Sequence, residues 1–140
     1  MKIAIINGPN LNLIGTREPG IYGSETFEHF FQKLRKKYET IDFDYFQSNI
    51  EGELINQIQQ SAKNSDGIIL NAGGYTHTSV AIGDAIAAIH MPVVEVHISN
   101  IEAREDFRKL SHISSKCIGT ISGFGLKSYL LAVESFINHI

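Results

Sequence analysis

The sequence is poor in cysteine, in clustered basic charge and in long apolar runs. Its single cysteine, Cys117, excludes a disulfide within the chain and is typical of a reducing compartment. The formal net charge of −3 comes without a basic stripe, so we expect no nucleic-acid partner. The apolar run after Lys2 is too short for a signal peptide, and no run approaches the ~20 residues of a membrane span. We therefore expect a globular protein of the cytoplasm that makes no membrane contact.

Metal-ligand spacings and domain boundaries are missing as well. No Cys/His pair has the spacing of a zinc site, and four histidines are scattered along the chain: His29, His90, His112 and His139. We expect no metal site. The 140 residues contain no linker, internal repeat or low-complexity segment, and a chain of this length can bury a substantial core. We therefore expect one domain over residues 1–140.

The sequence does contain a regular alternation of strand-like and helix-like segments. Runs rich in apolar residues predict buried parallel strands at 3–6, 67–70, 93–98 and 117–121. Alternating apolar and polar residues predict a half-exposed edge strand at 41–46. Apolar residues at helical spacing predict helices over about 27–38, 54–62, 82–89 and 126–137. The same spacing predicts a shorter helix over 102–111, with Phe107 and Leu110 turned inward.

Strict alternation of strand and helix predicts an α/β fold with a parallel sheet covered on both faces. Right-handed crossovers leave few topologies, and an edge-like second strand fits the doubly wound order 2-1-3-4-5. In such a sheet ligands bind beyond the carboxyl ends of the strands, near the point where the strand order reverses. We therefore expect the functional residues just after the first, third and fourth strands.

The segment after the first strand is unusually long. Eighteen residues from Asn7 to Ser24 separate strand from helix, and long ordered loops are often functional. Four glycines and two prolines predict that this loop has no regular structure. A guanidinium close to a phenol lowers its pKa, so Arg17 could bring Tyr22 into the range of a working base. The alternative is that Arg17 is a solvated charge and Tyr22 packs on the core.

The fourth strand contains a carboxylate two residues before a histidine. Because side chains alternate along a strand, Glu95, His97 and Ser99 share one face, opposite Val94 and Val96. Glu95 can hydrogen-bond one ring nitrogen of His97, which fixes the tautomer and stabilises the charged ring. The alternative is a structural ion pair at the end of a strand.

Two further segments contain candidate ligand-binding residues. The connection from Asn71 to Ser79 passes through two glycines to a helix capped by Thr76, Thr78 or Ser79. Free amides at such a helix start suit an anion, although plain turn chemistry explains the pattern too, and His77 alone fits a surface histidine. Arg108 is followed by no residue that would pair with it locally, so its guanidinium is a candidate to bind a carboxylate through two hydrogen bonds. For Arg104 and Lys109, a solvated helix face is the simpler interpretation.

Taken together, residues 7–23, 69–81 (ILNAGGYTHTSVA) and 95–101 (EVHISNI) closely resemble the type II 3-dehydroquinate dehydratases. The resemblance implies a flavodoxin-like domain that assembles as trimers packed into a homododecamer. It also implies a hydro-lyase that removes water from 3-dehydroquinate to give 3-dehydroshikimate, without cofactor or metal. This is a step of the shikimate pathway, serving either aromatic amino-acid biosynthesis or quinate breakdown.

The resemblance also implies roles for individual catalytic residues. Tyr22 takes the proton from C2 of the substrate, and Arg17 keeps that tyrosine ionised. Asn10 holds the water that hydrogen-bonds the enolate oxygen. His97, oriented by Glu95, donates the proton to the departing C1 hydroxyl.

The remaining residues implied by the resemblance bind substrate. Its hydroxyls and carboxylate are bound by Asn71, His77, Arg108 and the amides of Ile98 and Ser99. Asp84 reaches the site of a neighbouring subunit, which agrees with its place among the apolar residues Ile82, Ala85 and Ile86, where a carboxylate needs a partner. Gly83 departs from the family pattern, which often has a basic residue there, and this leaves the detail of the subunit contact open.

Two other kinds of protein with this fold fit the sequence less well. A flavin- or phosphate-binding module needs a short, Ser/Thr-rich loop after the first strand, whereas this loop is long and contains Arg17 and Tyr22. A phospho-receiver domain needs an acceptor aspartate at the end of the third strand, and Asn71 stands there instead.

Overall fold

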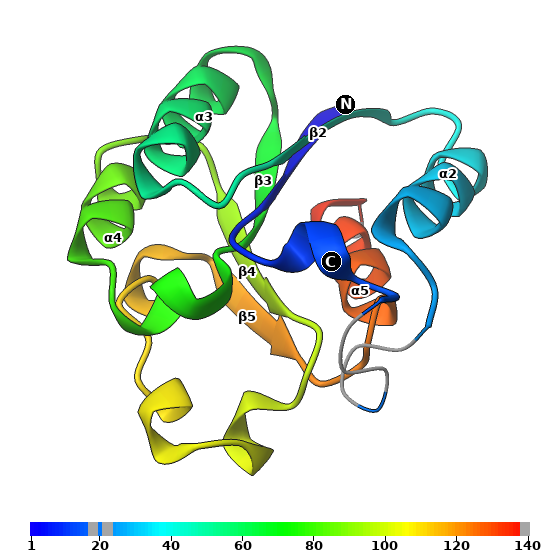
Figure 1. The fold of residues 1–140 in the computed structure, drawn as a ribbon. Coiled ribbons are helices and arrows are strands. Elements are labelled where there is room, and N and C mark those ends of the chain that lie inside the picture. The colour runs from blue at the N-terminus through cyan, green and yellow to red at the C-terminus, as the bar shows by residue number, and fades with distance from the viewer. Residues whose placement is uncertain (17–19, 21–23, 138–140) are drawn as a thin grey trace.

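A five-stranded parallel sheet organises the computed structural model, which describes residues 1–16, 20 and 24–137 (Figure 1). The strand order is β2-β1-β3-β4-β5, which confirms the predicted doubly wound order. The strands are β1 Lys2–Asn7, β2 Asp42–Gln47, β3 Gly67–Asn71, β4 Val93–His97 and β5 Gly119–Ser122. As predicted, β2 is an edge strand with a mixture of buried and exposed residues.

Helices cover both faces of the sheet. Figure 1 shows α2 and α5 on one side and α3 and α4 on the other. Their bounds are α2 Phe27–Lys37, α3 Glu51–Asn64, α4 Val80–Ala87 and α5 Lys127–Ile137. Of the three candidate caps for α4, Ser79 is the one observed, since its hydroxyl accepts the Ile82 amide at 2.9 Å. Among the described residues, no helix is long and apolar enough to cross a membrane.

The alternation of side chains along the strands divides the core into two layers. In β1, Ile3 and Ile5 pack with α2 and α5, whereas Ala4 and Ile6 pack with α3 and α4. Aromatic rings fill the first layer, where the Phe27 ring lies 4.6 Å from that of Tyr45 and 5.1 Å from that of Tyr129. In β4 the predicted division of faces is observed. Val94 and Val96 belong to the first layer and leave Glu95 on the opposite face.

Residues 102–111 do not form the predicted helix. Two 3₁₀ turns, Ile101–Ala103 and Asp106–Lys109, overlap this range, and Phe107 and Leu110 are 58% and 60% exposed instead of turned inward. At the end of this segment two backbone groups bind to the loop after β3: the Leu110 carbonyl accepts from His77 Nδ1, and the amide of the following His112 donates to the Thr76 carbonyl. Hydrogen bonds to the loop after β3 therefore hold this segment, in place of an apolar helix face.

Two smaller expectations were also wrong. The fifth strand starts at Gly119 and not at residue 117, and Gly119 and Thr120 are exposed because β5 is an edge strand beside β4 alone. The loop after β1 was expected to lack regular structure, but it contains a 3₁₀ turn at Leu11–Leu13. That turn forms because Leu11 is buried in the layer of α2 and α5.

Candidate functional site

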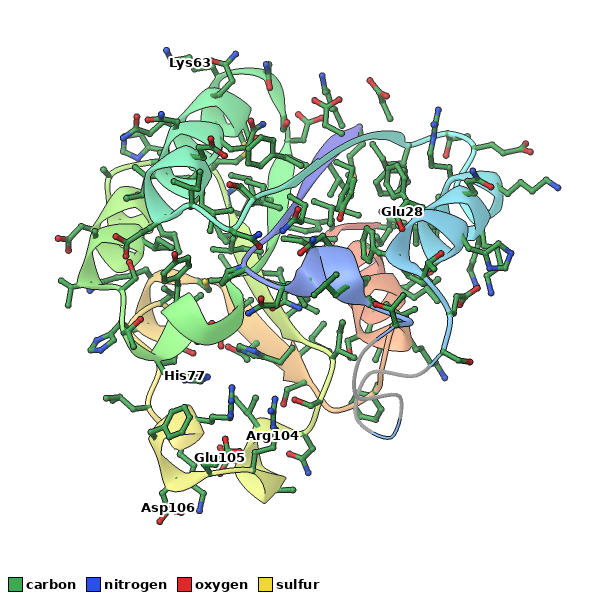
Figure 2. The ribbon with its side chains drawn as sticks, viewed as in Figure 1. Glu28, Lys63, His77, Arg104, Glu105 and Asp106 are labelled. Atoms are coloured by element: carbon green, nitrogen blue, oxygen red, sulfur yellow. The ribbon has the colours of Figure 1, made fainter. Side chains whose placement is uncertain are left out.

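A pocket of about 130 Å³ opens where β1, β3 and β4 end. Seven of the residues singled out from the sequence line it: Asn10, Asn71, His77, His97, Ile98, Ser99 and Arg108. Figure 2 shows His77 after β3 and Arg104 after β4, two lining residues from different segments of the chain. The topology therefore brings these residues together at the edge where a doubly wound sheet binds its ligands.

Close approach of two loops forms one wall of this pocket. The last residues of β1 and β3, Asn7 and Asn71, are neighbours in the sheet, and the Gly8 amide donates to the Asn71 carbonyl at 2.7 Å. A Cβ at Gly8 would lie 2.6 Å from the Ala72 carbonyl oxygen, so no other residue fits there without moving backbone. Beyond this contact Asn10 adopts the left-handed region (φ 68°), and its amide donates to Asn49 Oδ1 at 2.9 Å.

The Glu95–His97 pair has the geometry expected from the alternation of side chains. His97 Nε2 donates to Glu95 Oε2 at 2.6 Å, with Glu95 fully buried and His97 5% exposed. Because Nε2 is committed to the carboxylate, Nδ1 is the nitrogen left to exchange a proton. The neutral ring accepts a proton there, and the charged ring gives one up. The pair can therefore act as an acid or a base at the wall of the pocket.

Two hydroxyls that the sequence analysis missed support the buried carboxylate. Glu95 Oε1 accepts from Ser114 Oγ at 2.7 Å and from Ser111 Oγ at 3.0 Å. Burial alone would raise the pKa of Glu95. The hydrogen bond and charge of His97, together with the two serine hydroxyls, outweigh burial and hold this pKa below its ordinary value. Glu95 therefore stays ionised in a site without direct access to water.

We expect Ser114→Ala to weaken the folded state most at neutral pH. A hydrogen bond to a charged group contributes about 1.5–3 kcal/mol, so the free energy of unfolding should fall by about that amount. The pKa of Glu95 is lower in the folded state than in the unfolded state. Ionised Glu95 therefore stabilises the folded state fully at a pH above its unfolded-state pKa, and this stabilisation is lost as the pH falls through its folded-state pKa. Thermal unfolding across this acid range measures the difference between variant and wild type.

The control for this experiment is Ser61→Ala, which removes a buried hydroxyl that accepts from Gln57 and contacts no carboxylate in the part of the chain described. The stability difference for Ser114→Ala should shrink as the pH falls below the ordinary glutamate pKa, whereas the Ser61→Ala difference should stay level. If the stability difference between Ser114→Ala and wild type did not depend on pH, Ser114 would not stabilise the charge of Glu95.

His77 is held as a neutral acceptor beside His97. Its Nδ1 lies 2.7 Å from the Leu110 carbonyl oxygen, which can only accept, so the ring proton is on Nδ1 and Nε2 is the acceptor. Burial lowers the pKa of His77, and with the help of neighbouring His97 and Arg108 it outweighs the Leu110 hydrogen bond and the Glu95 charge, which raise this pKa. The two histidine rings face one another with centroids 6.2 Å apart. One neutral and one carboxylate-paired histidine suit different tasks, a hydrogen bond to a hydroxyl and a proton transfer.

Arginines line the side of the pocket after β4. Contrary to expectation, Arg108 has a local partner: Nε donates to the Glu105 carboxylate, and its guanidinium lies 4.8 Å from the Phe107 ring centroid. The i,i+3 spacing within the 3₁₀ turn brings Glu105 within reach. Arg104 was expected on a solvated face, yet it lines the pocket, where Nη1 donates to Ser99 Oγ at 3.3 Å. Two guanidinium groups at one wall favour an anionic ligand.

Asp84 lies outside the pocket. Its side chain is on the exposed face of α4, opposite the buried Ile82, Ala85 and Ile86, so the expected apolar surroundings are wrong for this chain. It borders a separate hollow with His112 and Lys116. In that hollow the His112 carbonyl approaches Gly83 so closely that a Cβ would lie 2.4 Å from its oxygen.

Two predicted catalytic residues are not described. Arg17 and Tyr22 both lie outside the described residues, so their predicted pairing is untested. No group of three His, Cys, Asp or Glu side chains suited to a metal ion occurs within residues 1–16 and 24–137. The described part of the site can bind a small anion with hydroxyl groups and move a proton at His97.

Comparison with known proteins places this geometry in one family. Residues 1–137 match the family model described as dehydroquinase class II. The chain is 53% identical over 142 residues to 3-dehydroquinate dehydratase from Prochlorococcus marinus (strain MIT 9301), covering all of this chain and 97% of that protein. It is 54% identical over 144 residues to 3-dehydroquinate dehydratase from Fusobacterium nucleatum, covering 99% of this chain and 98% of the other.

The structural comparison agrees. The crystal structure of type II dehydroquinase from Butyrivibrio crossotus superposes with a TM-score of 0.95 at 44% identity, covering 99% of this chain and 98% of that one. This likeness extends over the whole flavodoxin-like sheet and its helices. The chain therefore belongs to the class II dehydroquinases, a family of hydro-lyases.

Proposed function

We propose that the protein removes water from 3-dehydroquinate to give 3-dehydroshikimate, as the names of its curated relatives suggest. The observation that carries this proposal is the buried Glu95–His97 pair in the wall of a pocket that also contains Arg108. Elimination of a hydroxyl needs an acid for the leaving group, and the substrate's carboxylate needs a cationic partner. The pocket supplies a candidate for each.

The proposed reaction loses one proton from C2 and the hydroxyl from C1. Tyr22, kept ionised by Arg17, takes the C2 proton and leaves an enolate, whose oxygen is stabilised by a water on Asn10. The C1–O bond then breaks as His97 gives its Nδ1 proton to the departing hydroxyl, which leaves as water. Asn71, His77, Arg108 and the amides of Ile98 and Ser99 hold the ring in place. The roles of Arg17, Tyr22 and Asn10 rest on the family resemblance.

The test of this function is the ultraviolet absorbance of the conjugated enone that forms when 3-dehydroquinate is added to purified protein. The described residues lining the pocket include no lysine, so a Schiff base with substrate has no evident nucleophile there. We therefore expect the same rate before and after borohydride treatment in the presence of substrate. Absence of the enone would refute the function, and covalent trapping of substrate on a lysine would refute the mechanism.

We also propose that the protein works as a homo-oligomer in which Asp84 contributes to a neighbouring subunit's site. Its carboxylate is exposed on α4 and borders a hollow with Val80, itself 59% exposed. Phe107 and Leu110 are likewise exposed apolar residues of the segment after β4. An exposed acid beside Val80, together with the exposed apolar side chains of Phe107 and Leu110, fits a protein surface that contacts another subunit.

We expect Asp84→Ala to lower kcat/KM or to weaken assembly, with little change in the stability of the isolated fold because the side chain is exposed. Size-exclusion chromatography with light scattering, combined with the enone assay, measures both effects. Glu39→Ala removes another exposed carboxylate and should change neither. A wild-type protein that elutes as an active monomer would end this proposal.

A further inference from the structure

Tyr129, in the first turn of α5, is buried directly beneath the pocket. Its side chain is fully buried, and its hydroxyl lies between the last side chains of two neighbouring strands, Asn7 of β1 and Asn71 of β3. The hydroxyl donates to Asn7 Oδ1 at 2.8 Å and accepts from Asn71 Nδ2 at 3.0 Å. Of these three residues only Asn71 lines the pocket.

The hydrogen-bond inventory of these groups fixes the orientation of the Asn71 amide. The Gly73 amide can only donate, and it does so to Asn71 Oδ1 at 3.1 Å, so Asn71 turns its NH₂ group toward Tyr129. The Tyr129 hydroxyl accepts from that NH₂ group and gives its one proton to Asn7 Oδ1. With both ends of the amide held, one N–H of Asn71 remains available to a ligand.

The surroundings of the ring show that packing alone does not require a tyrosine. The Tyr129 ring contacts those of Phe27 and Phe30, at centroid distances of 5.1 and 5.9 Å, which a phenylalanine would satisfy equally. Burying a hydroxyl is costly unless it is hydrogen-bonded, so its role lies in the contacts with the two asparagines. Burial also holds the pKa of Tyr129 well above its ordinary value, which keeps the donor proton in place.

We propose that Tyr129 is a positioning residue for the dehydration: its hydroxyl orients the Asn71 amide so that the free N–H meets an oxygen of the bound substrate. This inference rests on the proposed function. Without the hydroxyl the amide keeps only its contact with the Gly73 amide, so its NH₂ group is held less firmly and the free N–H is no longer fixed where the substrate oxygen lies. A hydrogen-bonding group that is already oriented before the substrate binds contributes more to the binding free energy than the same group when it is free to rotate.

We expect Tyr129→Phe to raise KM roughly tenfold, the effect of about 1.4 kcal/mol, and to change kcat little, because Asn71 binds ground state and transition state alike. If Tyr129 acts through Asn71, the same substitution in an Asn71→Ala background should raise KM no further. The control is Tyr38→Phe, which removes a hydroxyl bonded to Glu134 on α5 and should leave KM unchanged. An equal KM increase in both backgrounds would overturn the inference.

A second measurement does not depend on turnover. The side-chain amide signals of Asn71 in nitrogen-15 NMR spectra of the ligand-free protein, assigned by their loss in Asn71→Ala, should shift or broaden in Tyr129→Phe and stay in place in Tyr38→Phe. Unchanged Asn71 signals in Tyr129→Phe would overturn the inference even if KM rose. A wild type that makes no enone from 3-dehydroquinate would refute the proposed function, whereas the amide signals would still report the contact.

Discussion

His97→Ala should lower kcat by about 10²- to 10⁴-fold, the contribution typical of a general acid, while product binding changes little. The reason is that His97 Nε2 is bonded to buried Glu95, which leaves Nδ1 for the proposed transfer of a proton to the departing hydroxyl. The hydrogen bond from Nδ1 to the leaving hydroxyl is strongest in the transition state, so its loss should lower kcat more than it raises KM. Steady-state kinetics of the enone assay, with product affinity from calorimetry, separate the two effects.

Glu95→Gln is the companion variant. It keeps an oxygen that can accept from His97 but loses the charge that stabilises the protonated ring, so its loss of kcat should be smaller than that of His97→Ala. A greater loss in Glu95→Gln would mean that the roles of the two residues are misassigned.

Tyr22→Phe should abolish measurable turnover, a loss of ~10⁴-fold or more, while substrate still binds. A phenol with a pKa of about 10 is almost wholly protonated at neutral pH, so the enzyme needs a group that favours the phenolate. We expect Arg17 to be that group. Arg17→Ala should therefore lose turnover at neutral pH and recover part of it as the pH rises and Tyr22 ionises unaided.

The pH–rate profile of Arg17→Ala measures this recovery. Its activity should climb between about pH 7 and pH 10, toward the ordinary tyrosine pKa. A flat profile would show that Arg17 does not tune Tyr22. Substantial activity in Tyr22→Phe would remove this tyrosine from the mechanism altogether.

The sequence predicted the features that depend on local periodicity. The alternation in β4 places Glu95 and His97 on one face because strand geometry requires it, and the strand order follows from regular alternation and right-handed crossovers. The polar residues that follow β1, β3 and β4 were predicted to meet because the carboxyl ends of adjacent strands lie at one edge, whereas the roles of individual residues came from the family resemblance. These inferences need no knowledge of distant contacts.

Apart from the local Arg108–Glu105 pair, the main features missed from the sequence depend on distant contacts. Ser111, Ser114 and Tyr129 reach Glu95 or Asn71 across 16, 19 and 58 residues, and hydroxyl side chains are too common for any local pattern to single them out. The expected helix over 102–111 was wrong because backbone bonds to Thr76 and His77 direct that segment.

The surroundings of Asp84 were misjudged for a related reason. Its apolar neighbours in sequence lie on the other face of α4, a distinction that spacing shows only once the buried face is known. Arg104 was predicted to lie on a solvated face because the sequence does not show which side of its segment faces the pocket. In the structure its side chain reaches Ser99 at the pocket.

We propose that 3-dehydroquinate reacts in the pocket between the ends of β1, β3 and β4. The most direct test is nitrogen-15 NMR of histidine-labelled protein during titration with the product, 3-dehydroshikimate. We predict saturable shifts of His77 Nε2 and His97 Nδ1, with His29 on α2 and His90, which borders a different hollow, unchanged as internal controls. Saturable binding of product that left the His77 and His97 signals unmoved would contradict the claim.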